Sequence, residues 1–389
     1  MRFEEPTGEQ KWAGVRRYTR LQDAYERFME QEGVPLYRGI GARDVRELTL
    51  APWGRMGGRG AYLQPDGTDG ISGHYVVEIP ARGELKPERH LYEELYLVID
   101  GHGAAEVWRE GGARKHVFEW QPGSLFSPPA NAWHRLYNTT GEPALLMGAT
   151  TAPHLINIFQ NYKFIFDNPF EFSDRYADDE DYFKPKDQIE ASADTQRAEL
   201  RTNFISDVTR MYLPLDNQRS PGYRRVAPKM GGNATWNTTF LAEHASGRYS
   251  KAHAHGSGAV LICLGGRGYT YTWPTSLGTR PWEAGKSDLV RRQDYVPGGL
   301  VSAAPGGGDW FHQHFGVGKE PLRILALITS GLRPAQEAAG EEIVSRNLNI
   351  QEGGKSISYG DEDPHIRTEY EGELEKEGVE FRMPASAYA

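Results

Sequence analysis

The chain has 389 residues, 38% hydrophobic and 25% charged, which fits a globular protein of two or three domains. Its formal net charge is -9 and it carries no basic stripe, so the composition argues against nucleic-acid binding. The single cysteine, Cys263, excludes an internal disulfide. No apolar run approaches the ~18 residues of a membrane span, and the polar N-terminus shows no signal segment, so we expect a cytoplasmic protein.

The first 47 residues predict an N-terminal arm that is helical in part. Apolar side chains recur at helical spacing: Leu21, Tyr25, Phe28 and Met29. Thr19 is the expected N-cap, and the helix should end before Gly33 and Pro35. We expect this arm to pack on a neighbouring barrel or on a second subunit.

From residue 48 the pattern changes to short alternating runs separated by Gly, Pro, Asn and Asp. We predict strands at 73–80, 95–99, 103–108, 118–120, 124–127, 133–137 and 144–151. Many short strands with regular turn signals indicate an antiparallel sandwich or barrel over residues 48–152.

Residues 153–232 lack this rhythm and are expected to connect two barrels, with the acidic stretch near 173–187 forming a solvated loop or a lid. A second β unit is predicted over 233–333, with strands at 238–244, 259–264, 269–273, 300–304, 310–315 and 323–329. Residues 334–389 form a polar C-terminal arm.

One stretch of the second unit contains a potential metal-binding pair. His253 and His255 are two residues apart, so on a strand both rings project from the same face, about 7 Å apart along the strand. The sequence Gly-Gly-Arg-Gly at 265–268 predicts a hairpin turn, with 269–273 as the returning strand.

The two β units also repeat one another. The first contains ERHLYEELYLVIDGHG followed by GSLFSPPANAWHRLYN, and the second contains HAHGSGAVLICLGGRG followed by GLVSAAPGGGDWFHQHF. Both follow the two motifs of the cupins, so the chain resembles a bicupin over roughly residues 60–150 and 235–332. The resemblance implies an all-β fold of two cupin (double-stranded β-helix, or jelly-roll) barrels with short helical N- and C-terminal arms.

The resemblance also implies the metal ligands. In the second barrel these are His253, His255 and His312, while Ala259 stands where the motif has Glu. His314 is an alternative ligand or an acid/base group.

In the first barrel, the corresponding residues are His90, Glu94 and His134. Glu88 replaces the first His of the motif and is a possible fourth ligand. A polar network without metal, involving neighbours such as Arg89, Glu93 and Arg135, is the alternative there.

A three-histidine set leaves the full charge on a divalent cation and favours an anionic, chelating substrate together with O2. The second barrel is similar to that of the gentisate and salicylate ring-cleaving dioxygenases, which implies Fe(II). Arg248 or Arg323 is the candidate for binding a substrate carboxylate. Four aromatic residues are candidates for the pocket lining: Trp236, Tyr269, Tyr271 and Trp310.

Other functions remain open. A redox-neutral isomerase, lyase or decarboxylase would use Mn, Zn or Ni. Oxalate decarboxylases are bicupins of this size, but they use three His and one Glu in each barrel, a set that Glu88 and Ala259 break. The chain could also be a non-catalytic binding protein, or catalytic only in its first barrel. The arms predict a homodimer or larger homo-oligomer.

Overall fold

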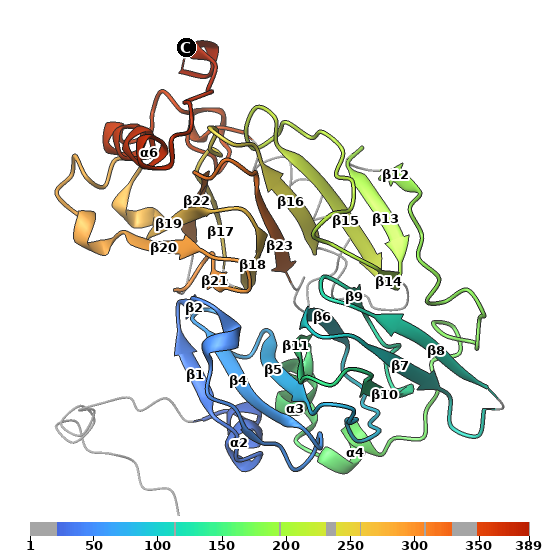
Figure 1. Ribbon diagram of the computed structural model, residues 1–389. Helices are drawn as coiled ribbons and strands as arrows, with labels where there is room; N and C mark the ends of the chain where they lie inside the picture. The colour runs from blue at the N-terminus through green and yellow to red at the C-terminus, as the bar shows by residue number, and fades with distance from the viewer. Residues whose placement is uncertain are drawn as a thin grey trace, which may run out of the picture.

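The structure is a computed structural model that describes residues 22–112, 114–193, 196–230, 239–256, 258–306, 309–328 and 348–388. The chain forms two β-barrels, here called barrel 1 (residues 51–150) and barrel 2 (residues 224–328), which lie against each other in Figure 1. Each barrel consists of one eight-stranded and one smaller sheet. The predicted all-β architecture of two jelly-roll barrels with short helical arms is confirmed.

Barrel 1 contains the strands that the alternating pattern predicted, within one to three residues at most ends. They are β3 (Ala51–Pro52), β4 (Arg59–Pro65), β5 (Gly73–Ile79), β6 (Glu94–Asp100), β7 (Gly103–Trp108), β8 (Lys115–Trp120), β9 (Leu125–Phe126), β10 (Trp133–Asn138) and β11 (Ala144–Thr150). The larger sheet also includes β1 (Leu36–Gly39), and β10, β7 and β8 form the smaller one. Strand β4 was not predicted, because it is buried on both faces and its sequence does not alternate between apolar and polar residues.

Barrel 2 repeats this plan. Its strands are β15 (Arg224–Met230), β16 (Phe240–His244), β17 (His253–His255), β18 (Ala259–Gly265), β19 (Gly268–Pro274), β20 (Arg291–Tyr295), β21 (Leu300–Ser302), β22 (Trp310–Gly316) and β23 (Leu322–Ile328). The smaller sheet has the order β17-β22-β19-β20, so it places the His253 strand beside the His312 strand.

The predicted hairpin at residues 265–268 is wrong. Strand β18 pairs with β21 and β23 in the larger sheet, whereas β19 pairs with β20 and β22 in the smaller one. The glycines let the chain cross between sheets: Gly266 has φ +76°, and a Cβ there would lie 2.2 Å from the carbonyl oxygen of Pro321. Gly101, between β6 and β7 in barrel 1, has φ +89° and the same role.

Segments outside the barrels complete their sheets. Strand β2 (Gly41–Ala42), from the N-terminal arm, pairs with β21 of barrel 2. Strand β14 (Phe204–Ile205), from the inter-barrel connection, pairs with β9 of barrel 1, and β12 (Ile189–Ala191) and β13 (Ala198–Thr202) extend the large sheet of barrel 2. One apolar core joins both barrels and includes Val76, Leu97, Leu241 and Val260. The domain boundaries proposed from the sequence stay predictions.

Helices lie at the outer ends of the two barrels in Figure 1. Near barrel 1 are α2 (Ala24–Gln31), α3 (Ala152–Phe159) and α4 (Tyr162–Phe166), and near barrel 2 is α6 (Pro364–Glu377). Short 3-10 helices occur at Val45–Glu47, Thr275–Leu277, Ser287–Leu289, Ile350–Glu352 and Ala385–Tyr388. The cap of α2 is Asp23, in a capping box with Glu26, and the expected cap Thr19 lies outside the described residues. Among the described helices, none is long and apolar enough to cross a membrane.

The C-terminal arm docks on barrel 2 through a buried carboxyl group. Glu362 accepts hydrogen bonds from Tyr249 Oη and, at 3.0 Å, from Gln313 Nε2. Burial raises the pKa of Glu362 to about 7, although these two donors lower it. Asp363 raises this pKa and Arg367 lowers it, both through their charges.

This carboxyl group gives a testable pH dependence. Between about pH 4.5 and about pH 7, Glu362 is protonated in the folded state but ionised in the unfolded chain. The stability that Glu362 contributes is therefore complete at acidic pH and falls as the pH rises through this range. Glu362→Gln should abolish this loss, which amounts to at most about 3 kcal/mol. Urea unfolding at pH 5 and pH 8 measures it, with the exposed Glu371→Gln as control. An unchanged pH dependence in Glu362→Gln would show that this carboxyl group is not the cause.

Candidate metal centres

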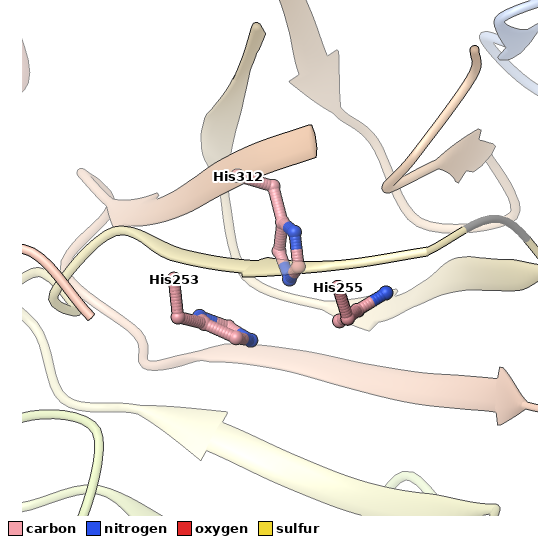
Figure 2. Close-up of side chains that lie close together, drawn as sticks. All are labelled: His253, His255 and His312. Carbon is pink, nitrogen blue, oxygen red and sulfur yellow. The ribbon is translucent and has the colours of Figure 1, made fainter. Parts of the chain in front are cut away.

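Three histidines converge inside barrel 2. Antiparallel pairing of β17 with β22 sets His253 opposite His312, and the two-residue spacing places His255 on the same face as His253. The ring centroid of His312 is 4.0 Å from that of His253 and 4.5 Å from that of His255. In Figure 2 the His312 ring descends between the other two. One ligand nitrogen of each lies within 4.8 Å of the others, and all three side chains are buried.

The surroundings set the protonation state of His253 and the orientation of His255. Burial, followed by the charge of Arg219, holds the pKa of His253 well below its usual value, so its ring is neutral. His255 Nδ1 lies 2.7 Å from the carbonyl oxygen of Gly256, which directs Nε2 toward the set when Nδ1 carries the proton. Ala259 is a buried residue of β18, and the converging set includes no carboxylate. A divalent cation here would keep its full charge.

His314 lies beside this set and is not part of it. Its ring is 5.2 Å from His312 and 5.4 Å from His244. The Tyr295 hydroxyl is 3.0 Å from His314 Nδ1. Burial holds the pKa of His314 well below its usual value, so the ring is neutral.

The two arginines proposed as substrate ligands are both engaged elsewhere. Arg323 donates at 2.6 Å to the carbonyl oxygens of Thr209 and Met211, which ties the inter-barrel connection to barrel 2. Arg248 donates from Nε to the carbonyl oxygen of Arg382 in the C-terminal arm. The structure therefore brings neither guanidinium into contact with the three histidines.

The aromatic candidates divide between two strand faces. Because Thr272 pairs with His312, the alternating Tyr269 and Tyr271 project from the opposite face of β19, where they pack with the C-terminal arm. Trp310 is on the same face of β22 as His312. Trp236 lies outside the described residues.

Arg219 is a cationic residue near this site that the sequence did not predict. The charge of Arg219 lowers the pKa of His253, His314 and His244, so its guanidinium lies within electrostatic reach of the set. Its carbonyl oxygen accepts from the Lys251 amide at 3.0 Å, which anchors this part of the inter-barrel connection next to β17. No motif marks Arg219, because it belongs to a connection and approaches the site only through folding.

A second donor set lies inside barrel 1. Glu88, His90, Glu94 and His134 each place a ligand atom within 4.8 Å of the others. Glu94 Oε2 is 3.2 Å from His90 Nε2 and 3.5 Å from His134 Nε2, and Glu88 Oε1 is 3.8 Å from His134 Nε2. Two ligands bound at right angles, each ~2.1 Å from a metal, are ~3 Å apart, so a divalent ion fits with small shifts.

The surroundings orient these donors. His90 Nδ1 is 2.8 Å from the Tyr92 carbonyl oxygen, and His134 Nδ1 is 3.3 Å from that of Ala132, so each Nε2 faces Glu94. Burial alone would raise the pKa of Glu94, but His90 and His134 outweigh it and hold that pKa well below its usual value. Glu94 is therefore an anion that a metal can bind.

Neighbouring polar groups are engaged outside this set. Arg89 pairs with Glu110, Glu93 with Arg175, and Arg135 with Glu106, at 3.1, 3.4 and 3.0 Å. These three residues therefore do not make the metal-free network that the sequence left open. The structure instead adds Tyr75, whose hydroxyl donates to Glu94 Oε1 at 2.5 Å and contacts the Tyr96 hydroxyl at 3.0 Å.

Two jelly-roll barrels with buried donors at the motif positions define the cupin type of fold. Residues 75–149 match the family model for the cupin domain, so the match includes His90, Glu94 and His134. No curated protein matches the chain. Among solved structures, the chain is similar to a deletion mutant of Bacillus subtilis oxalate decarboxylase, with 12% identity, a TM-score of 0.42, and coverage of 74% of this chain and 76% of that chain. A structure that concerns the Mn(II) centres of the same enzyme has 11% identity, a TM-score of 0.43, and coverage of 75% and 77%.

Proposed function

We propose that the protein is a divalent-metal-dependent enzyme that acts on a small anionic substrate able to chelate the metal. The supporting observation is that each barrel gathers a set of metal donors at its motif positions, all of them buried except Glu88, which is partly exposed. A bound metal would polarise a carboxylate or carbonyl oxygen of the substrate. The predicted homo-oligomer and the identity of the metal stay proposals.

Redox-neutral chemistry is the candidate that barrel 1 favours. Its set combines two histidines with two carboxylates, and such mixed nitrogen and oxygen donors suit Mn(II) as well as Fe(II) or Zn(II). Glu88 is at the accessible edge of the set, with 14% of its side chain exposed, and is placed to accept or return a proton. Burial raises the pKa of Tyr75 well above its usual value, so its hydroxyl stays protonated and holds Glu94 in place.

An Fe(II)-dependent dioxygenase reaction is the candidate that barrel 2 favours. Three neutral imidazoles and no carboxylate leave the cation able to bind an anionic substrate, with positions free for O2. In this reaction Arg219 would attract and orient the substrate carboxylate, and His314 would accept a proton.

Metal loading and oxygen dependence test both candidates. The metal-free protein is reloaded with Fe(II), Mn(II), Zn(II) or Ni(II), and bound metal is measured per chain. O2 uptake is followed with gentisate and salicylate, and product formation without O2 is followed with oxalate and malonate. O2 uptake with iron alone supports the dioxygenase, and turnover without O2 supports the redox-neutral enzyme. Absence of metal binding in both barrels would reject both, and tight metal binding without any turnover would favour a binding protein.

A further inference from the structure

An arginine borders the donor set of barrel 1. Arg55 Nη1 donates to Glu88 Oε2, and Arg55 Nε donates to Glu32 Oε2 at 2.7 Å. The guanidinium carbon lies 5.4, 5.7 and 5.9 Å from the ring centroids of Trp53, Phe166 and Phe28. Arg55 thus holds its charge within an aromatic wall, where an ion pair is stronger than at an open surface.

Glu88 joins this arginine to the donor set. One of its carboxylate oxygens is bound to Arg55, and the other is 3.8 Å from His134 Nε2. That His134 nitrogen is buried and has no hydrogen-bond partner among the described residues. Glu88 is therefore shared between the arginine and the position that a metal would take.

The edge that Arg55 and Glu88 form is also the accessible side of the set. The side chain of Arg55 is 22% exposed and that of Glu88 is 14% exposed, whereas those of Glu94 and His134 are only 2% and 3% exposed. Of these four side chains, Arg55 and Glu88 are therefore the ones that solvent contacts most.

A metal ion and Arg55 compete for Glu88. Ligation through Glu88 Oε1 would commit the charge of this carboxylate to the metal, which weakens the ion pair that Oε2 makes with Arg55. The guanidinium, held within an aromatic wall, would then favour a further anion.

We propose that Arg55 binds the carboxylate of the substrate in barrel 1, at the position that Glu88 occupies when no substrate is present. This inference rests on the proposed function, because it assumes a small anionic substrate at the barrel 1 set. Glu88 then links the two events: when it binds metal its ion pair with Arg55 weakens, and the substrate carboxylate takes its place.

Removing the Glu88 charge tests the proposal without metal or turnover. In metal-free Glu88→Gln, Arg55 has lost one of its two anionic partners and keeps only Glu32, so acetate should bind at least about fivefold more tightly than in the wild type, measured by NMR titration. Adding Arg55→Gln to this variant should remove the gain. Glu78→Gln is the matched control, because it frees Arg59, which is 52% exposed on the barrel exterior, and should leave acetate binding unchanged.

The outcomes separate this inference from the proposed function. Equal acetate affinity in Glu88→Gln and the wild type would overturn the role of Arg55, while Mn(II) binding to the wild type would still support the metal centre. A gain in acetate affinity without any Mn(II) binding would retain the anion site and reject the metal. If circular dichroism shows that Glu88→Gln does not fold, the effect of acetate on Mn(II) affinity is compared between the wild type and Arg55→Gln. Acetate should raise this affinity only in the wild type, and an equal effect in both would overturn the proposal.

Discussion

His255→Ala is expected to lower the affinity of barrel 2 for a divalent metal by more than about 100-fold, because it removes one of only three donors in the set. The two remaining histidines are buried, and the set has no carboxylate to compensate. Metal per chain, measured after dialysis against a defined metal buffer, should fall by one equivalent. If the reaction occurs in barrel 2, activity should be lost with it.

The control for this variant is His102→Ala, which removes an exposed histidine outside both sets. Both variants should keep the circular dichroism spectrum of the wild type, since β17 contributes its pairing through the backbone. Full activity in His255→Ala would show that barrel 2 is not the reaction centre. An unchanged metal content would show that the three histidines do not bind metal.

Glu94→Gln is expected to lower the metal affinity of barrel 1 about as much as His255→Ala lowers that of barrel 2. The substitution keeps the shape of the side chain but removes the anion that lies between His90 and His134. Because this carboxylate is buried and also accepts from Tyr75, we expect a stability cost of about 1–3 kcal/mol as well. Metal analysis and urea unfolding measure the two effects.

The adjacent residue supplies the control. Glu93 is next in sequence but pairs with Arg175 at 3.4 Å, away from the set, so Glu93→Gln should keep the full metal content. If Glu94→Gln retains as much metal as the wild type, barrel 1 is not a metal centre. Comparing the activity of the two single variants, Glu94→Gln in barrel 1 and His255→Ala in barrel 2, shows which barrel carries the reaction: it is the barrel whose variant loses activity.

Local sequence patterns predicted the two barrels, and the donors proposed at their motif positions lie close together in the structure. A strand alternates its faces every two residues, so the spacing of His253 and His255 fixed their common face before their pairing partner was known. The repeat of two motifs supplied the partners, since it aligned His312 with His134. These predictions rested on short-range geometry, on the comparison of one half of the chain with the other, and on the resemblance of both halves to the cupins.

Other features depend on contacts between distant segments. Glycines at 265–268 would serve equally in a hairpin or in a crossing between sheets, and only the pairing of β18 with β23 distinguishes them. Tyr269 and Tyr271 were assigned to the pocket because their strand was identified but its inward face was not. Arg55 and Arg219 lie outside both motifs, and nothing in their neighbouring residues indicates that folding carries them to a donor set.

The exchange of β2 and β14 between the barrels bears on how the protein could have arisen and how it can be dissected. Each half relies on an edge strand that the other half's flanking segment supplies, so a cut between them would leave two unpaired β edges. A duplicated ancestral gene would have had to gain these reciprocal additions after fusion. The two centres are therefore best studied by point substitutions in the intact chain.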